Sequence, residues 1–298
     1  MVSVWRRLDW SLPKTLREKL KNPMDTLWLL PALACYALSA ALFVFDRSSG
    51  RTRATGYAVA ILGAGTIFHA LDLTARGLQA GNIPVANFAQ ALSFLAWLTA
   101  LAGLLMIVRL RLAVIGAFVA PAVTIPLGAA SLATSSGRLV LPETLRSVWL
   151  PIHVTLAILG YTMFVLAASV SIVYLAYESR LKSKRALGPA NEGAPSLEKL
   201  DRINYRLLGW GFVMLSLAIV SGAIWADATW GHFWSWEPKE SWSLVIWILY
   251  AGLLESRLSI GWRGRRAAAL TIVLASVLVG SFVGFNLIFP GKHGGSFG

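Results

Sequence analysis

Four histidines are the residues of this sequence best suited to bind a metal ion. His153, His232 and His293 each lie near one end of an apolar segment, and His69 lies within such a segment. Neutral imidazole is the commonest metal ligand in proteins. A histidine in or beside a membrane is costly unless it has a partner, although a single one is more often a hydrogen-bonded structural residue. The case for a metal site therefore depends on whether two or more of these histidines converge.

The stretch WGHFWSWEPKESW, from Trp230 to Trp242, is the second feature that could do chemistry. Tryptophan occupies four of its thirteen positions: Trp230, Trp234, Trp236 and Trp242. Membrane interfaces favour tryptophan, which explains one or two of these residues but not four together. Flat indole rings stack well on a flat apolar ligand, and Lys239 could pair with a carboxylate of such a ligand. Pro238 and Glu240 suit the first turn of a helix, so a helix is expected to start here.

Two histidines flank this stretch in the sequence, and no cysteine cluster accompanies them. His153 precedes the stretch, His293 follows it, and Cys35 is the one cysteine in the chain. Zinc usually takes three or four protein ligands, whereas haem iron takes axial histidines. The two imidazoles and the aromatic bed therefore predict a haem site in which His153 and His293 are the axial ligands. Cys35 is interpreted as a small buried apolar residue.

A second polar group lies within an apolar segment. His69, Asp72 and Arg76 stand at i, i+3 and i+7, so they share one side of a helix. A polar stripe on a membrane helix should face the protein interior. The stripe could be a second haem contact, through the iron or a propionate, or a structural network that locks the helix in place. The sequence leaves both interpretations open.

Membrane-spanning helices are the elements that must position these residues. Hydrophobic residues make up 56% of the 298 residues and charged residues only 14%, which is too apolar for an ordinary soluble domain. A span needs about 20 mostly apolar residues. Eight segments qualify, at 26–44, 56–75, 88–108, 112–129, 149–175, 207–226, 241–256 and 267–290. Pro121 and Pro126 interrupt the fourth segment, and the seventh is short. We expect an all-α integral membrane protein, a polytopic bundle of about eight transmembrane helices.

The formal charge of +13 is better explained by membrane topology than by nucleic-acid binding. The basic residues lie in loops between spans, and none of their runs resembles a nucleic-acid-binding arm. The longest polar stretch, residues 176–206, carries seven Lys and Arg, so the positive-inside rule places it in the cytoplasm. Alternation of the spans then places the tryptophan-rich loop at 227–242 on the outer face of the cytoplasmic membrane, together with His153 and His293.

Residues 1–25 form a basic arm ahead of the membrane domain at 26–298. The arm holds six Lys and Arg and lacks the apolar core and cleavage site of a signal peptide. Its sequence WRRLDWSLPKTLREKL suits an amphipathic helix that lies on the membrane surface. Eight spans would place this arm outside, where so many basic residues are unusual, and its orientation stays open.

Four segments together resemble a known family. WGHFWSWEPKESW is similar to the WWD signature of haem-handling proteins in cytochrome c maturation, W-G-x-x-W-x-W-D-P-K-E-T-W, with Glu237 for Asp and Ser241 for Thr. NIPVANFAQALSFLAW at 82–97 resembles the P-x-x-N-x-Y-E-S-x-x-F-x-x-W stretch of the CcsA/ResC branch, the system II cytochrome c synthesis proteins. There Phe88 and Gln90 replace the usual Tyr and Glu. HVTLAILGYTMF at 153–164 and FVGFNLIFPGKH at 282–293 resemble two further segments of that branch, and the likeness extends over about residues 26–298.

The resemblance implies a role and a set of partners. Proteins of this branch move or present haem b on the outer face and work with a CcsB/ResB-type membrane subunit as a cytochrome c haem lyase. There the residues matching His153 and His293 are axial ligands, and the tryptophan-rich loop holds the haem with its vinyl groups exposed. Apocytochrome c brings a C-x-x-C-H segment whose thiols, kept reduced by other proteins, add to the vinyls.

One position departs from the family pattern, and other functions remain open. Glu255 stands where the family usually has a histidine linked to an inner haem site, in YAGLLESR. A carboxylate that reaches the interface is the simpler interpretation of Glu255, and His69 or a partner would have to supply any inner ligand. A shorter, CcmC-type haem exporter or delivery protein without lyase activity carries the same signature. A structural subunit whose aromatic loop only docks a partner is a third possibility.

Overall fold

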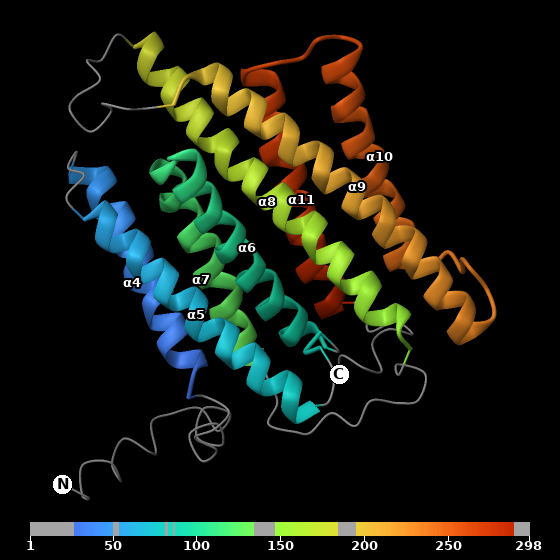
Figure 1. The fold of residues 1–298 in the computed structure, drawn as a ribbon. Helices are drawn as coiled ribbons and strands as arrows, with labels where there is room; N and C mark the ends of the chain where they lie inside the picture. Colours follow the sequence, from blue (N-terminus) through green and yellow to red (C-terminus); the bar gives the residue numbers. More distant parts are fainter. Residues whose placement is uncertain are drawn as a thin grey trace, which may run out of the picture.

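A computed structural model describes residues 27–49, 54–80, 83–85, 87–133, 147–183 and 195–288. These residues contain eight α-helices, a short 3-10 turn and no strand (Figure 1). The helices are α4 (Leu29–Ser49), α5 (Thr55–Ala80), α6 (Phe88–Leu110), α7 (Gly116–Ala133), α8 (Trp149–Lys182), α9 (Leu197–Trp230), α10 (Pro238–Leu258) and α11 (Arg265–Ile288). The predicted all-α bundle is thereby confirmed. The basic arm at 1–25 and His293 lie outside the described residues.

Seven of the eight helices are long and apolar enough to cross a membrane, which makes this a multi-pass membrane protein. The exception is α10, the segment that looked too short in the sequence; its 21 residues include several polar ones. The fourth predicted span is a single helix, α7, that contains both Pro121 and Pro126. The two prolines therefore do not end the helix, contrary to the interruption expected from the sequence.

Both ends of the polar stretch at 176–206 are helical, since α8 continues to Lys182 and α9 begins at Leu197. Both α8 and α9 have 34 residues, so each is about 50 Å long at 1.5 Å per residue, well beyond a hydrocarbon core of about 30 Å. Ion pairs at i,i+4 stabilise the projecting turns, between Glu178 and Lys182 at 2.8 Å in α8 and between Glu198 and Arg202 at 2.6 Å in α9. The sequence predicted the end of α8 too early and the start of α9 too late, because these turns are helical without being apolar.

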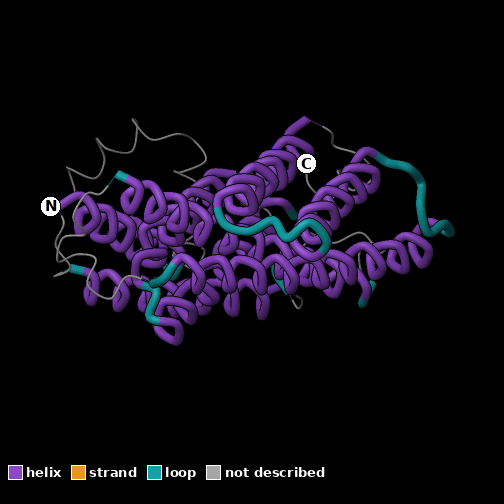
Figure 2. The backbone as a smooth tube through the Cα atoms, turned by 90° about the horizontal axis from the view of Figure 1, so that it is seen from above, coloured by secondary structure: helices purple, strands orange, loops and turns teal. Residues whose placement is uncertain are grey.

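The two long helices α8 and α9 form the centre of the molecule. They pack side by side, with α4 to α7 on one side of the pair and α10 and α11 on the other (Figure 1). Seen from above, the helices make one continuous bundle (Figure 2). The loop between α9 and α10 lies at one end of the bundle, and the turn between α10 and α11 lies at the opposite end.

Two glycines and one aromatic stack determine how closely α8, α9 and α10 pack together. A Cβ at Gly160 of α8 would lie 3.2 Å from the carbonyl oxygen of Gly211, and a Cβ at Gly211 of α9 would lie 2.7 Å from the Phe164 ring. Small residues of this kind let membrane helices pack closely. Tyr250 of α10 stacks on Phe164 with ring centroids 3.6 Å apart, which holds α10 against the α8–α9 pair.

A buried polar network fastens the same helices at the end that carries the α10–α11 turn. Arg257 of α10 is 7% exposed and pairs with Asp201 of α9 at 2.8 Å. The Arg257 guanidinium also donates to the Asn204 amide oxygen at 3.0 Å, and the Asn204 amide donates to the Ser171 hydroxyl of α8 at 2.8 Å. The backbone N–H of Gly264 donates to the Asp201 carboxylate at 3.0 Å. We call this set the Arg257 network.

Candidate functional site: a cavity beneath the tryptophan-rich loop

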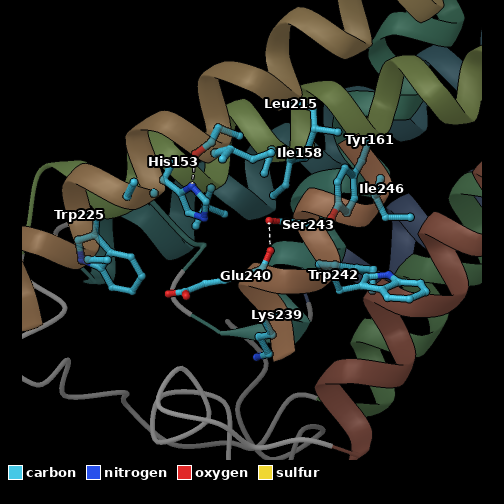
Figure 3. A pocket seen from close by; sticks show the side chains of 18 of the residues that line it. His153, Ile158, Tyr161, Leu215, Trp225, Lys239, Glu240, Trp242, Ser243 and Ile246 are labelled. Atoms are coloured by element: carbon cyan, nitrogen blue, oxygen red, sulfur yellow. Dashed lines mark hydrogen bonds between the residues drawn. The ribbon is translucent and has the colours of Figure 1, made fainter. Parts of the chain in front are cut away.

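A mostly apolar cavity of about 250 Å³ lies where α8 and α9 meet the first turns of α10 (Figure 3). Side chains from α6, α8, α9, α10, α11 and the loop between α9 and α10 line it. Four of the predicted site residues are among them: His153, Trp234, Lys239 and Trp242. Membrane proteins commonly place ligand sites between helices, in apolar pockets with a few polar groups. The cavity therefore has the character of a binding site for a mainly apolar molecule.

His153 lies on one wall of the cavity, across from Lys239, Glu240 and Trp242 (Figure 3). Its Nδ1 atom is 2.7 Å from the carbonyl oxygen of Ala218 in α9. A carbonyl oxygen only accepts hydrogen bonds, so Nδ1 carries the proton in this contact. The lone pair of the neutral ring is then on Nε2, the nitrogen that can bind a metal ion.

A row of stacked rings extends from His153 towards the loop. The imidazole lies nearly parallel to Trp225, with an interplanar angle of 18° and ring centroids 6.3 Å apart. Trp225 is 2% exposed and meets Trp230 edge to face at 5.0 Å, and Trp230 in turn stacks with His232 at 6.5 Å. Trp230 and His232 do not line the cavity. Trp230 thus packs against Trp225, which lines the cavity beside His153.

The tryptophans of the loop have different positions. Within the predicted loop at 227–242, only residues 231–237 are non-helical, since α9 continues to Trp230 and α10 begins at Pro238. Trp234 and Trp242 line the cavity, whereas Trp236 is 72% exposed and lies outside its lining. Trp236 has φ of 58°, in the left-handed region that bulky residues rarely adopt. Trp236 still meets Trp234 edge to face, with ring centroids 5.9 Å apart, so it packs within the loop without lining the cavity.

The Glu240 carboxylate organises the loop. It accepts hydrogen bonds from the backbone N–H of Ser235 at 2.8 Å, from the Ser235 hydroxyl at 3.1 Å and from the backbone N–H of Glu237 at 3.3 Å. Glu240 lies in the first turn of α10, where the helix dipole favours a negative charge. The expected helix start at Pro238 and Glu240 is confirmed.

We predict that Glu240→Ala loosens this loop. Glu240 is the third-residue partner of the capping box with Glu237, and loss of such a cap costs about 0.5–2 kcal/mol, while the Ser235 donors lose their acceptor. The variant should be cut faster by chymotrypsin within 231–237 in detergent micelles, whereas Glu255→Ala, at the exposed end of the same helix, should be cut at the wild-type rate. Equal cleavage rates for the two variants would show that Glu240 does not hold the loop.

Lys239 supplies a cationic group beside the cavity. Partial burial lowers the pKa of its amine, while the nearby Glu237 carboxylate raises it. An ammonium group in this setting favours a ligand that brings a carboxylate, since the ion pair would offset the loss of hydration.

His69 lies in another part of the bundle and does not line the cavity. It is fully buried in α5, with Nε2 2.9 Å from the Ser93 hydroxyl of α6 and Nδ1 3.4 Å from the Tyr36 hydroxyl of α4. One turn away, Asp72 pairs with Arg76 at 2.8 Å. Both ring nitrogens of His69 thus face hydroxyl groups of neighbouring helices. These contacts favour the structural interpretation of the stripe, in which it joins α4, α5 and α6.

Glu255 and Cys35 are also remote from the cavity lining. Glu255 is exposed near the end of α10 and accepts a hydrogen bond from the Ser259 hydroxyl. This agrees with a carboxylate that reaches the membrane interface. Cys35 lies partly buried in α4.

Most of the other lining residues were not identified as site residues from the sequence, and three of them shape the cavity. Gly222 of α9 adjoins the His153 ring, and Tyr161 of α8 directs its hydroxyl into the cavity (Figure 3). Phe282 of α11 meets Tyr161 at 5.6 Å and Phe88 of α6 at 5.5 Å, so the three rings close the side of the cavity between α6 and α11. Tyr161 could have been found, because it stands eight residues after His153, on the same face of a helix.

Comparisons with known proteins show the family to which the chain is related. A family model described as "Cytochrome C assembly protein" matches residues 85–293. Its first residue, Val85, is also the first along the chain to line the cavity, so α4 and α5 precede the match. The match extends to His293.

Individual relatives cover most of the chain. The chain is 34% identical over 250 residues to cytochrome c biogenesis protein CcsA of Synechococcus sp. (strain CC9902), covering 74% of this chain and 81% of that protein. It is 34% identical over 273 residues to CcsA of Synechococcus sp. (strain CC9605), covering 82% and 88%. The solved cytochrome c haem lyase CcmF has a similar fold, with a TM-score of 0.64 and 17% identity, covering 92% of this chain and 50% of that one.

Proposed function

This chain belongs to the cytochrome C assembly protein family, and on that premise we propose that it handles haem for cytochrome c biogenesis. In this proposal the chain binds haem b in the cavity as a substrate and presents it for covalent attachment to apocytochrome c. It acts as the CcsA-type subunit of a haem lyase. The observation that carries the proposal is His153, whose ring borders an apolar cavity with Nε2 as the ligating nitrogen.

The lining of the cavity fits a porphyrin. Apolar side chains from α8 and α9 and the indoles of Trp234 and Trp242 offer surfaces for a flat apolar ring. Lys239 offers an ammonium group to a propionate. His153 would hold the iron from one side, and His293, at the end of the family match, is the proposed ligand from the other.

The covalent step requires thiols that this chain does not supply. Each cysteine thiol of a C-x-x-C-H segment adds across one vinyl double bond, so that sulfur bonds to one carbon and the thiol hydrogen goes to the other. Two thioethers form, no group leaves and no electrons are exchanged with an external acceptor. The one cysteine of the chain, Cys35 in α4, does not line the cavity. The role of the chain is therefore to bind and orient haem, with the loop at 231–237 facing apocytochrome c.

The proposal includes partners and an orientation. We place the tryptophan-rich loop on the external face of the cytoplasmic membrane, because the basic ends of α8 and α9 lie at the opposite end of the bundle. A CcsB/ResB-type membrane subunit completes the lyase, and thiol-reducing proteins keep the apocytochrome cysteines reduced.

A reconstituted maturation assay tests the function. The chain is co-expressed with a CcsB/ResB-type subunit and an exported C-x-x-C-H reporter in a host without its own maturation system, and covalent haem on the reporter is measured after denaturing electrophoresis. We expect covalent haem with the C-x-x-C-H reporter and none with an A-x-x-A-H reporter. Haem bound to the chain without any transfer to the reporter would instead support a delivery protein of CcmC type.

A further inference from the structure

We propose that α9 positions His153 through a surface made of Ala218, Gly222 and Trp225, which we call the imidazole seat. The seat fixes the tautomer and the ring plane of His153, so that Nε2 is the nitrogen presented to the haem iron. These residues act through His153 and need not touch haem. The inference rests on the proposed function, because it assumes that His153 binds the iron.

The first part of the seat is the Ala218 carbonyl group. Its oxygen lies 2.7 Å from His153 Nδ1 and can only accept a hydrogen bond. The contact therefore selects the tautomer protonated at Nδ1. A histidine that binds a metal usually donates its other N–H in this way, which fixes the ring and raises the basicity of the ligating nitrogen.

The second part is Gly222, one helical turn after Ala218. A Cβ at this position would lie 2.6 Å from His153 Nδ1 and 2.7 Å from Cε1, closer than non-bonded atoms approach. The absence of a side chain at this position leaves the space that the imidazole needs to reach the Ala218 carbonyl.

The third part is Trp225, whose ring centroid lies 6.3 Å from that of the imidazole. The two rings are nearly parallel, at 18°, and Trp225 is 2% exposed, with Trp230 packed against its edge. A buried indole in this position limits rotation of the imidazole about its Cβ–Cγ bond. The hydrogen bond and the stack together leave one ring orientation.

The test compares two glycine-to-alanine variants on the same helix. Gly222→Ala should displace His153, whereas Gly209→Ala is the matched control, because no heavy atom lies within 4 Å of a Cβ there. Loss of a hydrogen-bond partner behind a metal ligand typically weakens metal binding by about 10- to 100-fold. We expect haem affinity of Gly222→Ala, measured by titrating the purified protein with haem, to fall by that factor, with a shift from a low-spin to a partly high-spin absorption spectrum. Added imidazole should reverse the shift.

Trp225→Leu tests the seat without adding an atom that would collide with His153, as the Cβ of Gly222→Ala would. It should leave the Nδ1–H hydrogen bond in place but free the ring plane, which broadens or shifts the low-spin ferric EPR signal. If Gly222→Ala fails to fold, as judged against Gly209→Ala by gel filtration, this variant decides. An unchanged EPR signal in Trp225→Leu would contradict the proposed role of the imidazole seat. An unchanged haem affinity in folded Gly222→Ala would contradict it as well.

A His153→Gly variant separates the failure of this inference from the failure of the function. If His153→Gly changes the haem spectrum and the seat variants do not, the seat is wrong and the ligand assignment stands. If His153→Gly itself leaves the spectrum unchanged, His153 does not bind the iron, and the seat falls together with that assignment.

Discussion

His153→Gly will lose the six-coordinate haem spectrum and bring cytochrome c maturation close to background. The substitution removes the imidazole whose Nε2 borders the cavity, and the neighbouring lining side chains, Trp225 and Ala218, offer no comparable ligand for iron. One axial position is then open, and the iron becomes five-coordinate and high-spin. Imidazole added to the solution fits the space left by the side chain and should restore the six-coordinate spectrum.

The matched control for this experiment is His232→Gly. His232 lies in the tryptophan-rich loop but stacks on Trp230 and does not line the cavity. Its variant should keep the wild-type spectrum and a substantial maturation activity. A result in which His232→Gly abolishes the spectrum while His153→Gly does not would reverse the ligand assignment.

Arg257→Ala will destabilise the folded protein by about 3–5 kcal/mol, the usual cost of removing one partner from a buried ion pair. Asp201 then loses its cationic partner, and Asn204 loses the guanidinium that donates to its amide oxygen. The loss should appear as a lower midpoint in SDS-induced unfolding from mixed micelles. Haem binding per folded molecule should change little, because Arg257 does not line the cavity.

An exposed ion pair on α9, the helix that carries Asp201, provides the control. Arg202 pairs with Glu198 at 2.6 Å, but the two side chains are 62% and 81% exposed. Arg202→Ala should therefore cost less than about 1 kcal/mol. If both arginine variants unfold at the same SDS fraction, the Arg257 network does not fasten α8, α9 and α10.

The apolar runs of the sequence predict the helices well and their ends less well. All eight expected spans are helices, since a segment of about 20 apolar residues has few alternatives in a membrane. The hydrophobic pattern does not predict the polar turns at the end of α8 and the start of α9, because ion pairs such as Glu178–Lys182 stabilise these turns. The expected span at 241–256 is also a helix, α10, although this helix is not among the seven that are long and apolar enough to cross a membrane.

The sequence predicts which residue types form the site better than it predicts which way their side chains point. The sequence indicates His153, Trp234, Lys239 and Trp242, and these four side chains line one cavity. The outward turn of Trp236 depends on a left-handed backbone conformation that no sequence pattern signals. Likewise, Gly222 matters because α8 brings His153 against it from 69 residues away, and such non-local contacts are set by packing.

The visible absorption spectrum of the purified full-length protein, oxidised and then reduced, tests the central claim most directly. The claim is that the cavity beneath the tryptophan-rich loop holds haem with His153 on the iron. It predicts a coloured protein with a six-coordinate, low-spin, bis-histidine spectrum in both oxidation states. Protein that stays colourless after haem is supplied, or that shows the same spectrum with and without the His153 imidazole, would contradict it.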